Sequence, residues 1–295
     1  MRLLIAGWHG QVARALIEAA PASPHVKALA AGRPALDLRD PKSVERAFGD
    51  IEPGIVINTA AYTGVDQAET EPDAAFALNQ EGARVLARAA ARRNVPVIHL
   101  STHYVFDGGK PEPYVESDEP HPLTIYGRSK LEGERAVAEA NPHHVIIRTG
   151  WVFGAVGRNF VTKILGLATG EDPLRIVADQ HGNPTYAPHL ALAILEVARQ
   201  LTQHERDASI WGTYHAAGTG ATSWHGFASE VVGCATRLGR PEVPVEPIVS
   251  LDYPTKAPRP FNSELDCTKF ERAFGLRLPS WQDGVADCVG RLLQP

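Results

Sequence analysis

Short apolar segments and helix-like segments alternate along the first half of this sequence. The apolar segments span residues 2–6, 26–30, 54–58, 96–100 and 144–148, and helix-like segments lie between them. The run GIVIN at residues 54–58 has no polar alternation, as is usual for parallel strands that are buried on both faces. Strands that alternate with helices predict an α/β fold, here a Rossmann-type doubly wound parallel sheet.

The alternation becomes less regular after residue 150. We therefore expect an NADP-binding Rossmann domain at residues 1–149 and a smaller, mainly substrate-binding α/β region at residues 150–295. Residues 175–200 are expected to return to the Rossmann sheet. The elements expected in this half are a turn at 151–157, helices at 159–168, 187–201, 223–238, 268–274 and 281–293, strands at 175–177 and 212–217, and a proline-rich loop at 241–260.

The composition is that of an ordinary soluble globular chain and narrows the class of partner. A net charge of −5 and the lack of a basic block give no electrostatic reason to bind nucleic acid or an anionic membrane. The first apolar run is too short for a signal peptide, and the three distant cysteines suit a cytoplasmic location. The twelve histidines show no metal-ligand spacing, so no protein metal site is expected.

The pentapeptide YGRSK at residues 126–130 is a candidate catalytic motif. Residues four apart lie on one face of a helix, so Tyr126 and Lys130 can point into one cleft. A nearby ammonium lowers the pKa of a phenol, and a hydroxyl such as Thr102 can share a hydrogen bond with it. Such a phenol can donate a proton to a carbonyl that receives hydride from a cofactor. The alternative is a surface helix with a packed tyrosine and a solvated lysine.

Other polar and glycine-containing segments lie where the predicted strands end. Gly7, residues 58–62, residues 101–102 and residues 148–149 all close or follow a strand. In doubly wound sheets, ligands bind beyond the carboxyl ends of the strands. This shared placement favours a catalytic cleft over the surface-helix alternative.

The first predicted strand leads into a glycine turn that is typical of dinucleotide-binding folds. The spacing Gly7-x-x-Gly10-x-x-Ala13 places backbone N–H groups at the start of a helix, where they can bind a pyrophosphate. After the second strand there is no acid until Asp37, and Arg33 is available for the 2′-phosphate of NADP. We expect NADPH in preference to NADH, unless Arg33 is simply a solvated loop residue.

Segments along nearly the whole chain resemble the dTDP-4-dehydrorhamnose reductases, a family of the extended short-chain dehydrogenase/reductase superfamily. They comprise residues 7–10, 58–66, 101–108, 126–134, 148–154, 179–188, 223–224 and 259–263. The later segments distinguish this family from other short-chain reductases. The resemblance implies reduction of the C4 ketone of dTDP-6-deoxy-L-lyxo-4-hexulose, with NADPH or NADH, to dTDP-L-rhamnose.

The resemblance also implies a role for individual residues. Tyr126 would donate the proton, Lys130 would lower its pKa and hold the nicotinamide ribose, and Thr102 would hydrogen-bond the substrate oxygen. The expected cofactor-binding residues are Gly7, Gly10, Gln11, Val12, Arg33, Asp37, Leu38, Ala60, Ala61, Tyr62, Thr63, Tyr126 and Lys130. The expected substrate-binding residues are Thr102, His103, Tyr104, Trp151, Asn159 and Arg259. Trp151 offers a sugar an apolar face, and Arg259 can pair bidentately with a phosphate.

Three positions depart from the family pattern. The family usually has Asp where this chain has His103, Ser or Ala at Gly150, and often a basic or small residue at Phe261. His103 either changes the hydrogen bonding of the ketone pocket or faces away from it. These departures leave the hydride chemistry intact but leave the sugar and its nucleotide open.

Similar enzymes can be dimers that Mg²⁺ bridges through carboxylates. Glu116, Asp118 and Glu119 alone do not establish such a site, so both Mg²⁺ binding and the choice between monomer and homodimer stay open.

Two other functions share this fold. The regulatory subunit of methionine adenosyltransferase resembles the same family and binds a dinucleotide without catalysis, but Thr102, Tyr126 and Lys130 together favour an enzyme. An epimerase or dehydratase shares the Tyr-x-x-x-Lys pattern, whereas Trp151 and residues 179–185 favour a reductase. The sequence therefore predicts an NADPH-dependent reductase of dTDP-4-dehydro-L-rhamnose or of another nucleotide-linked 4-keto sugar.

Overall fold

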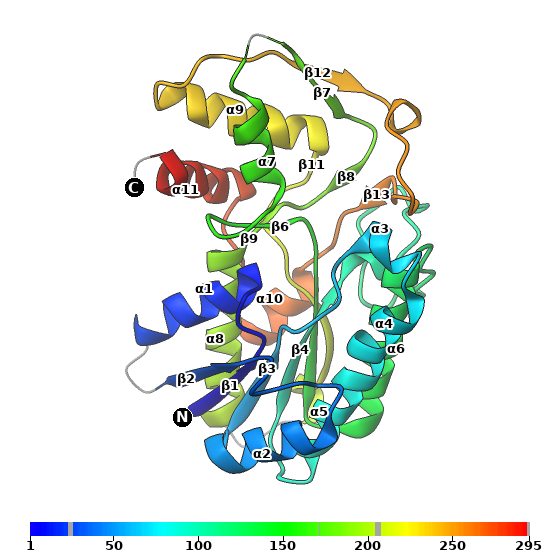
Figure 1. The fold of residues 1–295 in the computed structure, drawn as a ribbon, viewed down its shortest axis with the longest axis vertical. Coiled ribbons are helices and arrows are strands. Elements are labelled where there is room, and N and C mark those ends of the chain that lie inside the picture. The colour runs from blue at the N-terminus through cyan, green and yellow to red at the C-terminus, as the bar shows by residue number, and fades with distance from the viewer. Residues whose placement is uncertain (23–25, 171, 204–207, 294–295) are drawn as a thin grey trace.

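The computed structural model describes residues 1–22, 26–170, 172–203 and 208–293 (Figure 1). Within these residues, six parallel strands form the main sheet in the order β10-β5-β4-β3-β1-β2. They are β1 (Arg2–Ala6), β2 (Lys27–Ala31), β3 (Ile55–Asn58), β4 (Val97–Thr102), β5 (His144–Thr149) and β10 (Gly212–His215). The predicted α/β class and the doubly wound parallel sheet are confirmed.

Helices cover both faces of the main sheet because successive strand residues point to opposite sides (Figure 1). Leu3 and Ile5 pack on one face, against α1 (Gln11–Ala19), α8 (Ala187–Gln203) and α10 (Thr268–Phe274). Leu4 and Val56 pack on the other, against α2 (Pro41–Ile51) and α5 (Ala83–Ala91), with α6 (Ile125–Ala140) beside them. Each fully buried aliphatic side chain stabilises the fold by about 1.5–3 kcal/mol.

Side-chain caps fix where two of these helices begin. Asp40 accepts a hydrogen bond from Lys42 N at 2.9 Å, and Pro41 occupies the first turn of α2. Thr124 accepts from Gly127 N at 2.9 Å and starts α6, the helix that carries the candidate catalytic motif.

The helical segment between β3 and β4 is irregular. It consists of α4 (Pro72–Phe76), a π-helical turn η2 (Ala77–Gly82) and α5, and the short helix α3 (Val65–Ala68) precedes it. In the π turn, buried Asn79 accepts from Tyr62 N at 2.7 Å and donates to Ser129 Oγ at 2.9 Å. The irregular turn therefore points a polar side chain at α6.

A second core, which we call the cap region, is formed by residues 151–186, 222–263 and 281–293. Its helices are α7 (Phe160–Leu167), α9 (Trp224–Arg237) and α11 (Trp281–Leu293), which lie above the main sheet in Figure 1. Its strands are β6 (Val152–Phe153), β7 (Leu174–Val177), β8 (His181–Gly182), β9 (Thr185–Tyr186), β11 (Thr222–Ser223), β12 (Val245–Ile248) and β13 (Asn262–Ser263). They pair as β7–β12, β6–β9 and β11–β8–β13.

The structure corrects three expectations for this half. Residues 241–260 contain β12 and a 3-10 turn at Ser250–Asp252, and residues 151–157 contain β6. Strand β7 pairs with β12 and does not join the main sheet, so the expected return of residues 175–200 holds for helix α8 but not for the strand. Strand β10 supplies the further strand of the main sheet. Pro247 is tolerated in β12 because a two-stranded sheet leaves an edge on which no N–H is needed. The domain division at residues 149–150 stays a prediction.

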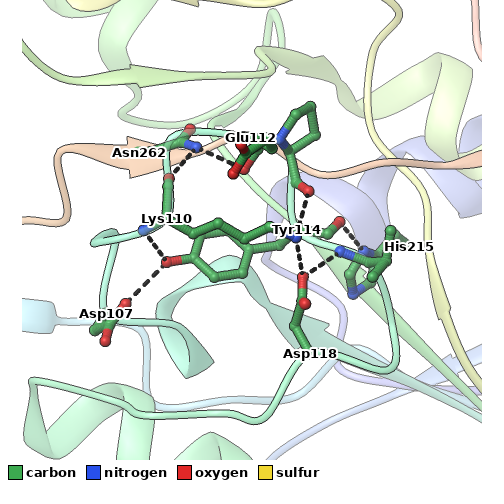
Figure 2. A network of polar contacts seen from close by, with 9 residues as sticks. Asp107, Lys110, Glu112, Tyr114, Asp118, His215 and Asn262 are labelled. Carbon is green, nitrogen blue, oxygen red and sulfur yellow. Dashed lines mark hydrogen bonds and ion pairs between the residues drawn. The ribbon is translucent and has the colours of Figure 1, made fainter.

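The segment that connects β4 to α6 is fixed by a polar network (Figure 2). The Tyr114 hydroxyl donates to Asp107 Oδ1 at 2.8 Å, and the Tyr114 carbonyl lies 3.0 Å from His215 Nδ1 on β10. Asn262 on β13 donates to the carbonyl of Lys110 at 2.8 Å. The network therefore links the main sheet, through this segment, to the cap region.

Candidate active site

Two cavities open at the carboxyl ends of the main-sheet strands. The Tyr126 cavity has a volume of about 560 Å³ and the Arg33 cavity about 680 Å³. Predicted residues that line the Tyr126 cavity are Gly10, Gln11, Val12, Ala61, Thr63, Thr102, His103, Tyr104, Tyr126, Lys130 and Trp151. Those that line the Arg33 cavity are Gly7, Gly10, Arg33, Asp37, Leu38, Ala60, Ala61, Tyr62 and Thr63. Gly10, Ala61 and Thr63 line both, so the two cavities adjoin.

The glycine turn leaves backbone donors facing these cavities. Gly7 has φ +106°, and a Cβ there would lie 2.6 Å from Thr59 Oγ1, so both backbone and space require glycine. Helix α1 begins after Gly10 with no side-chain cap among the described residues, so its first N–H groups stay available for an anion. Gln11 donates to the Val152 carbonyl at 3.2 Å, and its buried Oε1 has no partner among the described residues. The turn therefore fits a dinucleotide.

Close packing at the start of α6 places Tyr126 beside Thr102. A Cβ on Gly127 would overlap the Tyr104 carbonyl oxygen, so glycine lets the helix approach the segment after β4. The rings of Tyr104 and Tyr126 meet edge to face, with centroids 5.6 Å apart. The Thr102 hydroxyl accepts from Tyr104 N at 3.2 Å and is near enough to the Tyr126 hydroxyl to favour its ionised form.

Burial controls the acidity of the Tyr126 hydroxyl. It raises the pKa of Tyr126 to about 12, and the nearby Thr102 hydroxyl opposes this shift. Lys130 is not among the groups that shift this pKa, and its Nζ donates to the Leu100 carbonyl at 2.7 Å, so the expected lowering by Lys130 stays a prediction. The phenol is therefore protonated at neutral pH, as a proton donor must be.

Lys130 itself is buried among polar groups. Burial lowers the pKa of Lys130 to about 8. Glu134, whose side chain comes from the same face of α6, opposes this shift through its negative charge. Arg148 binds the Glu134 carboxylate bidentately, at 2.9 and 2.7 Å, and the Ser101 hydroxyl donates to it as well. The ammonium of Lys130 is therefore less stable than that of a solvated lysine.

Two of the departures from the family pattern are in contact. A Cβ on Gly150 would lie 2.5 Å from Nδ1 of the His103 ring, so Gly150 makes room for this imidazole. His103 is buried, its Nδ1 has no partner among the described residues, and burial lowers its pKa to about 4. Both residues line the Tyr126 cavity, where His103 is a neutral ring.

Trp151 reaches the cavity from a strained position. Its φ of +48° is in the left-handed region, and its ring stacks on Trp224 with centroids 3.5 Å apart. A Cβ on Gly182 would lie 2.8 Å from the indole, so a glycine is needed on the other side. The cap region thus fixes this side chain at the cavity wall.

The Arg33 cavity holds an acid between two arginines. Arg39 binds the Asp37 carboxylate with Nε at 3.1 Å and Nη2 at 2.8 Å, and the pKa of Asp37 falls to about 2. The charge of Arg33 acts in the same direction. Trp8 packs closely on Gly32, whose added Cβ would lie 2.5 Å from the indole. Sequence reasoning missed Trp8 and Arg39, although each adjoins a predicted residue.

Two predicted substrate-binding residues are absent from the described lining of both cavities. Asn159 caps α7, where it accepts from Thr162 N at 3.2 Å and donates to the Gly154 carbonyl at 2.7 Å. Arg259 forms an ion pair of 2.6 Å with Asp66, whose Oδ1 also accepts from Ala257 N at 3.0 Å. Their predicted contacts with substrate stay predictions.

Sequence reasoning also missed several lining residues that adjoin the motifs. These are His9, Val65, Val152 and Arg158. They lie in the segments that follow β1, β3 and β5, whereas Ser101 and Thr149, which the sequence placed at strand ends, line the same cavity as the strand-end rule predicts.

Neither a metal-binding cluster nor a membrane-spanning helix is present among the described residues. They contain no group of three His, Cys, Asp or Glu side chains that could hold a metal ion. None of their helices combines the length and the apolar character needed to cross a bilayer.

A Rossmann-type sheet in which a glycine turn and a Tyr-x-x-x-Lys helix line adjoining cavities defines an oxidoreductase of the short-chain dehydrogenase/reductase class. A family model described as the RmlD substrate binding domain matches residues 1–294. The chain therefore belongs to this family, that of the dTDP-4-dehydrorhamnose reductases, as the sequence motifs predicted.

Similar sequences and solved structures match nearly the whole length of the chain. A dTDP-4-dehydrorhamnose reductase of Sinorhizobium fredii is 47% identical over 293 residues, which are 99% of this chain and 98% of that one. The crystal structure of such a reductase from Clostridium acetobutylicum has a TM-score of 0.91 at 34% identity and covers 99% of both chains. That of Bacillus anthracis, in complex with NADP, has a TM-score of 0.89 at 34% identity and covers 97% of this chain and 98% of its own.

Proposed function

We propose that this protein reduces the C4 ketone of dTDP-4-dehydro-L-rhamnose with NADPH and forms dTDP-L-rhamnose. The observation that carries the proposal is the arrangement of Tyr126, Thr102 and Lys130 in one cavity that adjoins the Arg33 cavity. The names of the similar reductases support the sugar, and the NADP complex of a similar structure supports the cofactor. The cytoplasmic location and the state of monomer or homodimer stay predictions.

The residues at the glycine turn fit the dinucleotide. The uncapped N–H groups after Gly10 would bind the pyrophosphate, and Arg33 would bind the 2′-phosphate. Lys130 would hold the nicotinamide ribose from beneath the cavity. A reduced nicotinamide, when bound, supplies the hydride.

Tyr126 and Thr102 act on the substrate oxygen. Negative charge develops on the C4 oxygen as the ketone is reduced, and the Tyr126 hydroxyl donates its proton there. A phenol whose pKa burial raises to about 12 is fully protonated before this step. The Thr102 hydroxyl, which favours the ionised form of Tyr126, stabilises the phenolate that remains.

The test is NADPH oxidation with dTDP-4-keto-6-deoxyglucose and a 3,5-epimerase that supplies the L-sugar. We expect oxidation that depends on the epimerase and requires this protein. Protein that binds NADPH but oxidises none in this assay would contradict the proposed substrate, and other nucleotide-linked 4-keto sugars would then be compared.

Tyr126→Phe tests the proton donor in the same assay. The change removes only the hydroxyl, so kcat should fall roughly 10²–10⁴-fold while the Kd for NADPH stays nearly constant. A variant that keeps full activity would remove Tyr126 from the proton-donor role.

A further inference from the structure

A buried polar row lies between the main sheet and α6, next to the candidate active site. Asn58 on β3 and His99 on β4 are partners in the strand register, and both side chains are 1% exposed. Lys130 of α6, 2% exposed, reaches the same row from above the sheet. The proposed reduction uses only Lys130 of these three residues.

The orientation of Asn58 fixes the tautomer of His99. Asn58 Oδ1 accepts a hydrogen bond from Ala60 N at 3.2 Å, so its amide nitrogen must face His99 Nδ1, 3.0 Å away. An amide nitrogen only donates, and His99 Nδ1 is therefore an acceptor without a hydrogen. Burial holds the pKa of His99 well below its usual range, so the ring is neutral. Its single hydrogen is on Nε2.

This N–H points toward the side-chain nitrogen of Lys130. The distance from His99 Nε2 to Lys130 Nζ is 3.4 Å, and Nζ donates to the Leu100 carbonyl at 2.7 Å. An ammonium has only donors and cannot accept the imidazole hydrogen, whereas a neutral amine has a lone pair that can. This tautomer therefore favours the amine form of Lys130 over its ammonium form.

Other charges near this pair act on it from neighbouring elements. Glu134, one turn along α6, favours the ammonium of Lys130, but its carboxylate is bound by Arg148 of β5. His144, at the start of β5, lowers the pKa of His99 further. The Tyr126 hydroxyl lines the same cavity as Lys130.

We propose that Asn58 and His99 form a positioning pair that controls the protonation of Lys130 through the tautomer of His99. The inference rests on the proposed role of Lys130 in catalysis. Reversing the tautomer would turn Nε2 into an acceptor, which would hold Lys130 as the ammonium.

Asn58→Asp is the variant that reverses the tautomer. One carboxylate oxygen can still accept from Ala60 N, and the other can accept a hydrogen from His99 Nδ1. Asn79→Asp is the matched control, because Asn79 is also 1% exposed and also accepts a backbone N–H, but it donates to Ser129 and not to a histidine. The control introduces the same carboxylate beneath α6 without touching the ring.

The first measurement is the ¹⁵N spectrum of the histidine rings, which distinguishes protonated from unprotonated nitrogens and needs no substrate. His99→Gln identifies the His99 signals by their loss. We expect a hydrogen on Nε2 in the unmodified protein and on Nδ1 in Asn58→Asp. If His99 of the unmodified protein carries a hydrogen on Nδ1, or on both nitrogens, the proposal is overturned even if no variant folds. This outcome does not depend on whether the protein reduces the proposed sugar.

The second measurement is the pH profile of the NADPH Kd and, where the reductase assay succeeds, of kcat. Burial lowers the pKa of Lys130 to about 8, so a basic limb is expected there as the ammonium is lost. In Asn58→Asp this limb should move up by about one pH unit, because Lys130 gains an acceptor. An equal shift in Asn79→Asp would mean that charge alone is responsible and would refute control by the tautomer.

Discussion

His103 and Gly150 illustrate how one substitution can require another. The space for the imidazole exists because residue 150 has no Cβ, and an added Cβ would lie 2.5 Å from Nδ1. An aspartate at position 103, which the resemblance to the family leads us to expect, is shorter than histidine. The two departures are therefore one change in the shape of the Tyr126 cavity.

Gly150→Ser should destabilise the protein by about 1–3 kcal/mol, because the His103 ring must move within a packed wall. In a His103→Asp background the same change should cost much less. Urea unfolding of the two single variants and the double variant measures the coupling. Additive free energies of unfolding would show that the two residues do not compete for space.

Charge in the Arg33 cavity should determine the choice of cofactor. Asp37 would repel a 2′-phosphate, but Arg39 binds both of its oxygens and Arg33 adds a second positive charge. Removing either arginine leaves the acid less compensated. The ribose hydroxyl of NADH carries no charge and is indifferent to this change.

Arg33→Ala and Arg39→Ala should each raise the KM for NADPH more than that for NADH. We expect roughly a 10- to 100-fold loss of NADPH preference, since hydrogen bonds to charged groups contribute about 1.5–3 kcal/mol. Arg46→Ala, which removes an exposed arginine of α2, is the control. Equal effects on both cofactors would exclude the two arginines from 2′-phosphate binding.

Periodicity and composition predicted the helices and strands that depend only on local sequence. The continuous apolar run of β3 is buried at every position, and the last two helices have the predicted bounds. The strand β12 was not predicted because it depends on pairing with β7; Val245 pairs with Leu174, which lies 71 residues earlier in the chain. The acceptor for Lys130 is likewise a backbone carbonyl, which no side-chain motif records.

The ion pair between Asp66 and Arg259 connects the short helix α3 to the segment after β12. Asp66 also binds Ala257 N, so one carboxylate secures both the side chain and the backbone of that segment. The Asp66 side chain is 45% exposed, so solvent weakens the pair and its contribution to global stability should be below about 1 kcal/mol.

Asp66→Asn should therefore loosen residues 249–259 without lowering the stability of the whole protein appreciably. Hydrogen exchange of peptides from this segment should become faster, whereas the Tm should change little. Arg2→Ala, which breaks an exposed ion pair with Glu52 far from this segment, is the control. Unchanged exchange in Asp66→Asn would show that other contacts hold the segment.

For the molecule as a whole, buried neutral histidines should make stability depend on pH. Burial lowers the pKa of His103 to about 4 and of His215 to about 3, and His99 is shifted in the same direction. An unfolded histidine has a pKa of about 6.5, so below this pH the unfolded chain binds protons that the native chain does not. Stability should therefore fall as the pH decreases from about 6.5 toward 4.

Urea unfolding at about pH 7.5 and about pH 5.5 measures this loss of stability. Each buried histidine contributes up to about 1.4 kcal/mol per pH unit. His215→Gln should reduce the difference between the two pH values, whereas replacing the exposed His121 should not. A difference that His215→Gln leaves intact would assign the acid sensitivity to other groups.

The path of the chain between its two cores limits how such a protein can diversify. The segments of the cap region alternate along the sequence with α8, β10 and α10, which pack on the main sheet. A single crossover with a related gene would therefore pair half of one cap with half of another and leave mismatched cores. New sugar preferences should arise by matched point substitutions in the cavity wall, of the kind seen at His103 and Gly150, and not by exchange of a module.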